Sequence, residues 1–142
     1  MFNSYGWIKL GMNRKHLDIM DEEIQIKYDK LDIGLDDKVV KKLEAMLNEN
    51  EIIKYDFIGS LNNLDSFLSI QLSRNHYSPR LRNFYKWVSE ISDGSHGILY
   101  EMNDEDKEFN SDRPYKIWRL IGSNFEECEE SIINDKYHEV NY

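Results

Sequence analysis

A strand pattern followed closely by a strong helix pattern restricts the fold of this chain more than any other feature. Residues 67–74 alternate apolar and polar side chains, with Leu68, Ile70 and Leu72 on one face. This period of two is typical of a strand with one buried face. A helical stripe follows at Leu81, Phe84, Tyr85, Val88 and Ile91. The two apolar surfaces can be buried by packing against each other, which predicts a helix lying on a sheet.

The ends of this helix have their own signals. Ser78 can cap its N-terminus, and Pro79 suits the first helical position, where a missing N–H costs nothing. Gly94 can end it. The basic residues Arg80, Arg82 and Lys86 are expected on its outer face.

Further elements are predicted on both sides of this unit. Residues 51–59 form a strand pattern that a turn-like segment, 60–65, joins to 67–74 as an antiparallel hairpin. Other strand patterns cover Tyr5–Leu10, His96–Asn103 and Tyr115–Ile121. Asp36 and Asp37 suit the start of a second helix, whose stripe is Val39, Val40, Leu43, Met46 and Leu47. Residues 17–31 have mixed helix and strand periodicity.

This order predicts an α+β fold. We expect a two-layer domain over residues 1–142, in which two or three helices cover one face of a largely antiparallel sheet of about five strands. A chain of 142 residues can bury one core of its own. A split β-α-β arrangement stays open at this point.

Acidic side chains gather toward the C-terminus. The sequence has a formal net charge of −9, and residues 101–142 hold 12 acidic and 5 basic side chains. A negative field repels nucleic-acid phosphates and speeds encounter with a basic protein. The charge therefore favours a basic protein partner over direct nucleic-acid binding, although acidic loops also serve solubility alone.

No catalytic or metal-binding pattern stands out. Adjacent strand residues point to opposite faces, so Ser95 and His96 do not form a nucleophile and base pair. The four histidines have no short ligand spacing, and Cys128 has no second thiol for zinc. The loop 104–112 resembles a calcium loop but has Phe109 and Tyr115 where a glycine and a bidentate glutamate are needed. The sequence predicts no enzyme, no cofactor and no metal.

The remaining features agree with a soluble scaffold. Paired loop carboxylates such as Asp104 and Asp106 are expected to be solvated rather than catalytic, and the glycines form no phosphate-binding loop. Trp7, Trp87 and Trp118 are expected in the core. A lone cysteine and the lack of a long apolar run predict a cytoplasmic protein without a membrane span.

Several short segments resemble, in the same order, family seven of the immunity proteins of bacterial polymorphic toxin systems. They are Ser4–Ile8, Asn75-His76, Gly94–Tyr100 and Asn103–Asp106. In that family a Gly-Trp strand precedes a Gly-Ser-x-Gly-Leu-Leu-Tyr strand, an acidic loop and a last aromatic strand. Tyr115–Arg119 corresponds to that last strand here.

The resemblance implies a monomeric immunity protein that binds the C-terminal domain of a cognate toxin in a 1:1 complex. It also implies that the toxin is delivered by contact-dependent growth inhibition, and a basic nuclease blocked at its active site fits the acidic charge. We hypothesise that the toxin-facing surface contains two acidic clusters. Their residues are Asp104, Glu105, Asp106, Glu108, Asp112, Glu126, Glu127, Glu129 and Glu130. We expect Trp7, Tyr100 and Trp118 to hold the fold.

Two other classes stay open. A small acidic adaptor of an unrelated complex has the same charge and the same lack of chemistry. A hydrolase or metal-dependent enzyme would need His76 or His96 for its activity. Ser95 and His96 have either a turn-stabilising or a contact role.

Overall fold

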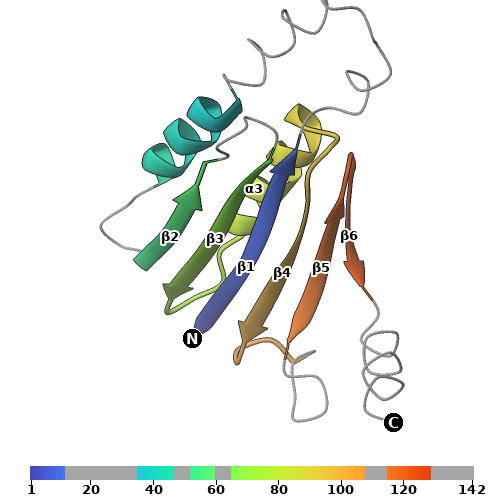
Figure 1. Cartoon of the computed structure of the whole chain (residues 1–142). Helices are drawn as coiled ribbons and strands as arrows, with labels where there is room; N and C mark the ends of the chain where they lie inside the picture. Colours follow the sequence, from blue (N-terminus) through green and yellow to red (C-terminus); the bar gives the residue numbers. More distant parts are fainter. Residues whose placement is uncertain (12–34, 47–51, 60–64, 108–114, 129–142) are drawn as a thin grey trace, which may run out of the picture.

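The computed structural model describes residues 1–11, 35–46, 52–59, 65–107 and 115–128. In chain order the elements are β1 (Phe2–Gly11), a helix over residues 35–46, β2 (Ile52–Ile58), β3 (Asp65–Arg74), α3 (Arg80–Ile91), β4 (His96–Asn103), β5 (Lys116–Ile121) and β6 (Asn124–Cys128). The predicted α+β class is confirmed. The sheet has one strand more than expected, because β6 follows β5 across a tight turn (Figure 1).

The strands form one open antiparallel sheet in the order β2-β3-β1-β4-β5-β6. Strand β1 lies between β3 and β4 and is antiparallel to both, so β3 and β4 are parallel to each other. Helix α3 connects them. The split β-α-β arrangement that the sequence left open is therefore present, with the first strand of the chain inserted at its centre.

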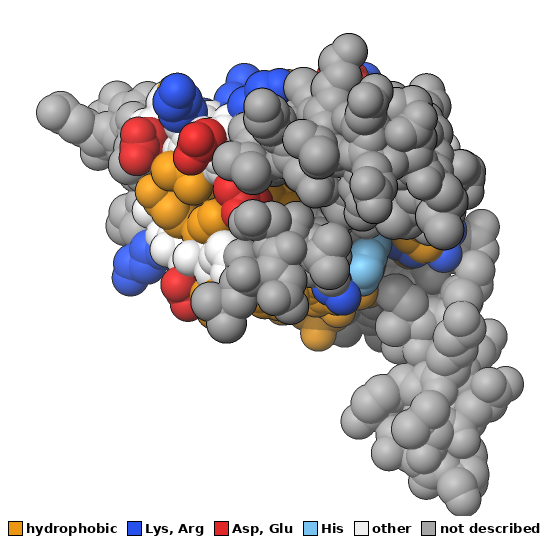
Figure 2. Space-filling model, turned by 45° about the horizontal axis from the view of Figure 1, so that its top comes forward, with side chains coloured by type: hydrophobic (Ala, Val, Ile, Leu, Met, Phe, Trp, Pro, Cys, Tyr) orange, Lys and Arg blue, Asp and Glu red, His pale blue; other side chains and the backbone are white. Residues whose placement is uncertain are grey.

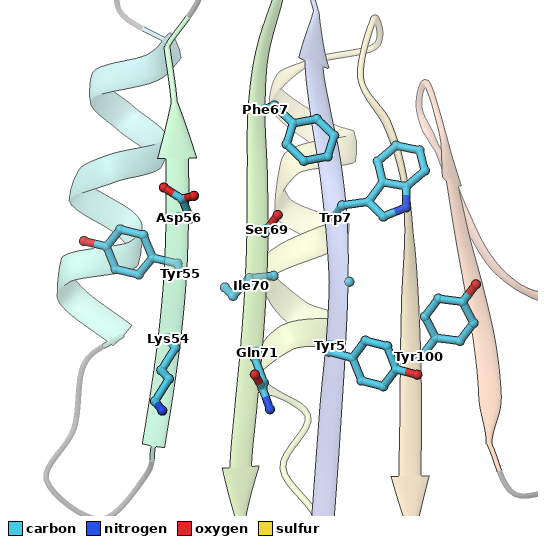
Figure 3. Close-up of a pocket in the computed structure, with 11 residues that line it drawn as sticks. Tyr5, Trp7, Lys54, Tyr55, Asp56, Phe67, Ser69, Ile70, Gln71 and Tyr100 are labelled. Carbon is cyan, nitrogen blue, oxygen red and sulfur yellow. The ribbon is translucent and has the colours of Figure 1, made fainter.

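Both helices cover the same face of the sheet, as Figures 1 and 3 show. The helix over 35–46 contributes Val39, Leu43 and Met46 to the core. The core also contains Leu81, Phe84, Tyr85 and Val88 of α3 and Phe2, Ile8, Leu10, Leu68, Ile70, Leu72, Leu99 and Leu120 of the sheet. Each large apolar side chain buried in this way contributes roughly 1.5–3 kcal/mol, so the two layers hold each other in place.

Two glycines bring β1 and β4 unusually close together. A Cβ atom at Gly6 would collide with the carbonyl group of Ile98, and one at Gly97 would collide with the carbonyl oxygen of Trp7. The hydroxyl of Tyr85 fills the space under this pair and donates to the carbonyl oxygen of Ile98 at 2.8 Å. The Gly-Trp and Gly-x-Leu-Tyr sequence segments thus meet as cross-strand partners at the centre of the sheet.

A buried serine cluster ties three segments together at the upper end of the sheet. Ser92 Oγ donates to the carbonyl oxygen of Gly11 at 2.7 Å, and Ser95 Oγ donates to Ser92 Oγ at 2.8 Å. The turn between β5 and β6 joins them through Gly122, whose N–H donates to the Ser95 carbonyl at 2.8 Å. Gly122 has φ of 60°, which favours glycine. Ser95 therefore stabilises this turn.

Three details differ from the sequence prediction or fall outside the description. Helix α3 begins at Arg80 with Pro79 at the N-cap, and Ser78 Oγ only accepts a long bond of 3.4 Å from the Arg80 N–H. Arg82 does not lie on the outer face: its guanidinium reaches Glu101 beneath the sheet. The ambiguous segment 17–31, Leu47 and the turn residues 60–64 lie outside the described residues.

Candidate functional site

The face of the sheet opposite the helices carries a row of aromatic side chains. Strand alternation directs Ile8 and Leu10 into the core, and it directs Tyr5 and Trp7 away from it. Phe67 of β3 and Tyr100 of β4 project from the same face, as Figure 3 shows. The expectation that Trp7 belongs to the core is wrong: it is half-buried on the open face. Trp87 and Trp118 do pack against the core.

These rings contact one another across β3, β1 and β4 and reach the residue just before β5. Trp7 stacks on Phe67 with ring centroids 5.9 Å apart, and Tyr5 stacks on Tyr100 at 5.1 Å. Tyr115, just before β5, meets Tyr100 edge-on at 6.2 Å, and His96 meets Trp7 edge-on at 5.9 Å. Such ring pairs stabilise each other beyond the area they bury, so the row is a preorganised surface.

The open face also gathers exposed apolar side chains. Tyr5, Ile58, Phe67, Met102 and Ile121 are each at least 38% exposed, and all lie on this face by strand register. Figure 2, in which the upper end of the molecule is turned forward, shows hydrophobic side chains at the surface with acidic and basic ones beside them. Apolar patches that gather in this way on a monomer are typically binding surfaces.

Tyr5 keeps its proton well into the alkaline range. Burial raises the pKa of its hydroxyl above the ordinary value, and the neighbouring Tyr115 and Tyr100 hydroxyls raise it further. At neutral pH the Tyr5 phenol is thus an uncharged group that can both donate and accept hydrogen bonds. The face offers a partner apolar ring surface with a polar edge.

A hollow of about 500 Å³ lies in the left half of this face, in the view of Figure 3. It is open to solvent. Trp7, Tyr5 and Tyr100 line one side, Lys54 and Asp56 of β2 line the other, and Phe67, Ser69 and Gln71 of β3 lie between them. A pocket with aromatic walls and a few polar groups is suited to binding one side chain or small group.

The described part of the predicted acidic loop lies at the lower end of β4, where each carboxylate meets a basic group. The amino group of Met1 pairs with Asp104. Glu105 lies 3.0 Å from His76 Nδ1, and Asp106 lies 3.9 Å from Lys116 Nζ. These contacts are wholly or partly exposed, so each is worth at most about 1 kcal/mol and can be exchanged for a partner's cation.

The predicted glutamate cluster falls on the edge strand β6. Glu126 pairs across strands with Arg119 on the open face, and Arg119 Nη2 donates to Glu126 Oε1 at 2.8 Å. Glu127 lies opposite Trp118 and so points to the helix side. The two glutamates therefore lie on opposite faces of the sheet. Glu108, Asp112, Glu129 and Glu130 lie outside the described residues.

One charged residue that sequence reasoning missed is buried under the sheet. The Glu101 side chain is only 1% exposed, and Arg82 Nε donates to both of its oxygens at 2.8 and 2.9 Å. Trp118 Nε1 donates to Glu101 at 2.7 Å, and its ring lies 4.3 Å from the Arg82 guanidinium carbon. The alternation of side chains along the strand was the available signal for its burial. Gly97, Leu99 and Glu101 are spaced two residues apart and therefore lie on the same face of the sheet. The cluster is structural and lies away from the open face.

The described ranges contain neither a candidate metal site nor a candidate membrane-spanning helix. Across residues 1–11, 35–46, 52–59, 65–107 and 115–128, no group of three or more His, Cys, Asp or Glu side chains is placed to hold a metal ion. No helix in these ranges is both long and apolar enough to cross a membrane.

The geometry defines a small α+β protein whose open sheet face can bind another molecule through aromatic, apolar and acidic groups. The sequence model of the immunity protein 7 family matches residues 1–133, and the chain belongs to this family. The resemblance seen in the Gly-Trp and Gly-Ser-x-Gly segments is thereby confirmed. No curated protein and no solved structure matches the chain. Membership supports an immunity function directed against a toxin.

Proposed function

We propose that this protein binds the C-terminal domain of a cognate toxin in the cytoplasm and blocks its active site. The observation that carries the proposal is the face of the sheet opposite the two described helices, where exposed aromatic and aliphatic side chains gather on a chain of an immunity family. A tight protein complex buries about 1,600 Å² and is dominated by a few aromatic or charged anchors. This face supplies the aromatic anchors.

The toxin is proposed to be a basic nuclease delivered by contact-dependent growth inhibition. The net charge of −9 supports this assignment, because a nuclease binds phosphates through a cationic groove that an acidic protein can occupy. Within this proposal Asp104, Glu105 and Asp106 border the toxin at the lower end of the sheet, and Glu126 borders it at β6. Glu127 and the remaining acidic positions, Glu108, Asp112, Glu129 and Glu130, add to the attractive field.

The protein acts by binding alone in this proposal, as a monomer that forms a 1:1 complex. Inhibition then depends on occupancy and needs no turnover. The rigid core under the aromatic face supports such a role, because a preorganised surface loses little freedom on binding.

A growth assay tests the proposal. The toxin domain encoded directly upstream of the gene for this chain is induced in bacteria with and without co-expression of the protein. Growth arrest by the toxin alone and full growth with the protein are expected, together with co-purification of the two chains. A toxin domain of an unrelated system serves as the control, which the protein should not neutralise. Arrest despite co-expression would contradict the proposal and favour the adaptor class.

A further inference from the structure

Strand β2 is one of the two outermost strands of the sheet, and no described strand pairs with its outer side. It pairs with β3 without a break from Ile52 to Ile58. It contains no proline and no glycine, so nothing in its sequence interrupts the outer row of N–H and C=O groups. Such a row is a template on which another strand can form hydrogen bonds.

The other outermost strand, β6, is a poorer template. It is only 5 residues long, and Glu126 and Glu127 give it two negative charges. The two charges of β2 have opposite signs, because Asp56 follows two residues after Lys54. Like charges protect an edge strand from pairing, whereas opposite charges can each be matched by a partner. Of the two edges, β2 is therefore the one suited to a further strand.

Lys54 and Asp56 form a charge pattern that a neighbouring strand can match. Both side chains are exposed on the open face, as Figure 3 shows. Their neighbours on β3 are neutral, with Gln71 opposite Lys54 and Ser69 opposite Asp56. No hydrogen bond or ion pair joins either charge to another described residue. Side chains directly opposite on an added strand would come within about 5 Å of them.

The other face of β2 carries apolar side chains that are incompletely covered. Ile53, Tyr55 and Phe57 pack against the core, yet all three are only partly buried. In Figures 1 and 3 the helix over residues 35–46 lies beyond the outer side of β2. A strand added to β2 would lie over this helix and bury more of the three side chains. Burial of apolar surface would stabilise the added strand.

We propose that an extended segment of the toxin pairs with β2 as an antiparallel strand and continues the sheet. The proposal rests on the proposed function, because the toxin supplies the strand. Every neighbouring pair in this sheet is antiparallel, and this is the more stable kind of pairing. The segment has a basic, an apolar and an acidic residue at alternate faces, which lie opposite Asp56, Tyr55 and Lys54 in that order.

A second copy of this chain has matching charges but a poor fit. Two β2 strands paired antiparallel about Tyr55 would set each Lys54 opposite an Asp56. The pairing would also place both copies of the helix over residues 35–46 on the same side of the joined sheet. Because this helix lies beyond the outer side of β2, the two copies would crowd the junction. A toxin segment without a helix on that side avoids this crowding.

A charge exchange within β2 tests the side-chain part of this contact. The probe is the catalytically inactive toxin domain encoded directly upstream, titrated against the full chain. The double variant Lys54→Asp with Asp56→Lys keeps the net charge and turns two attractive pairs into repulsive ones, so Kd should rise at least about tenfold. Lys86→Glu with Glu90→Lys, the same kind of exchange at exposed positions of α3, should leave Kd unchanged. Equal effects of the two exchanges would overturn the proposal.

A matching exchange in the toxin identifies its strand. In each segment of the toxin domain with a basic, an apolar and an acidic residue in sequence, the two charged residues are exchanged. One such toxin variant should bind the wild type weakly and should regain affinity for the β2 double variant, because the charges form the same contact. If no segment is coupled to Lys54 and Asp56 in this way, the proposal is wrong.

Amide hydrogen exchange measures the backbone part of the contact. Alternate N–H groups of an edge strand point outward and exchange with solvent unless another strand accepts their hydrogen bonds. We expect the outward N–H groups between Ile53 and Phe57 to exchange at least about tenfold more slowly in the complex than in the free protein. A fully formed complex in which none of them is slowed would overturn the inference.

The outcomes separate this inference from the proposed function. If the wild type binds and rescues growth while the β2 charge exchange and the β2 N–H groups show no effect, only the edge pairing is wrong. If the wild type binds no toxin domain, both fall. A dimer of the free chain that Lys54→Asp weakens and the double variant restores would assign the edge to a second copy, and this result would also overturn the inference.

Discussion

The hydroxyl of Tyr85 occupies the space beneath Gly6 that any larger residue at position 6 would need. The contact joins α3 to the central strand β1 and fixes how the helix layer sits under the sheet. Because Trp7 follows Gly6 directly, the same contact sets the position of the aromatic face on the other side. Tyr85 Oη also lies 3.3 Å from the Trp7 carbonyl oxygen.

Replacing Gly6 with alanine should destabilise the protein strongly. The new Cβ would meet the backbone of Ile98 and the Tyr85 hydroxyl, and neither can move without disturbing the core. We expect the free energy of unfolding to fall by about 3 kcal/mol, measured by urea denaturation. Gly59→Ala is the matched control, because its nearest neighbour is Asp36 Oδ2 at 3.5 Å. Equal effects at the two positions would contradict the close packing of β1 and β4.

Replacing Tyr85 with phenylalanine should remove a buried hydrogen bond. The Ile98 carbonyl would lose its 2.8 Å donor, and the variant should lose about 1–2 kcal/mol of stability at neutral pH. Tyr77→Phe is the control, since the Tyr77 side chain is 41% exposed. A loss no larger than that of the control would show that the hydroxyl contact does not hold the layers.

The contribution of Tyr85 to the free energy of unfolding should fall at alkaline pH. Burial raises the pKa of Tyr85 well above its ordinary value of 10.0, so the folded chain keeps a phenol proton that the unfolded chain releases. The stabilisation is fully present below pH 10 and is lost as pH rises toward the folded-state pKa, by about 1.4 kcal/mol per pH unit. The stability difference between wild type and Tyr85→Phe should therefore shrink above pH 10. A constant difference would contradict this reasoning.

Breaking the Arg82 and Glu101 pair from one side should be costly. Arg82→Met leaves a carboxylate with 1% exposure without its cation, and we expect a loss of about 3–5 kcal/mol in urea denaturation. Adding Glu101→Leu to this variant should recover part of the loss, because the buried charge is then gone. Lys86→Met, at an exposed position of the same helix, should change stability little. A small loss for Arg82→Met would mean that the pair is dispensable.

The acidic clusters are predicted to act on the rate of association with the toxin. A triple variant, Asp104→Asn with Glu105→Gln and Asp106→Asn, should associate about tenfold more slowly at low ionic strength. A variant with glutamine in place of glutamate at positions 126, 127, 129 and 130 should also associate about tenfold more slowly at low ionic strength. At 0.15 M salt, charges more than about 8 Å apart are largely screened from each other. The differences in association rate between the wild type and the two variants should therefore be smaller. Unchanged association rates at low salt would refute the proposed placement of these clusters.

Much of the fold could be read from side-chain periodicity. The alternation of residues 67–74 and the stripe of α3 each predict an element and its buried face, and both are present. Strand β6 has only Phe125 packed against the core, so it lacks an alternating signal. Its pairing with β5 depends on the turn at Gly122, which a sequence pattern does not define.

The open face was detectable in part. Tyr5 and Trp7 have the opposite parity to Ile8 and Leu10, so they must point away from the core. Their assembly with Phe67 and Tyr100 required the strand order, because β1 becomes the neighbour of β3 and β4 only through tertiary pairing. Arg82 was misplaced for a related reason: a long side chain on a helix can reach a partner, Glu101, that is distant in sequence.

Footprinting of the complex tests the central claim, that the aromatic face is the surface that meets the toxin. Hydroxyl radicals modify exposed aromatic side chains, and Tyr5 and Tyr77 are both 41% exposed, so they form a matched pair. We predict that saturating toxin domain protects Tyr5, Trp7 and Phe67 from modification and leaves Tyr77 unchanged. Undiminished modification of Tyr5 and Phe67 in a complex that is fully formed would contradict the account.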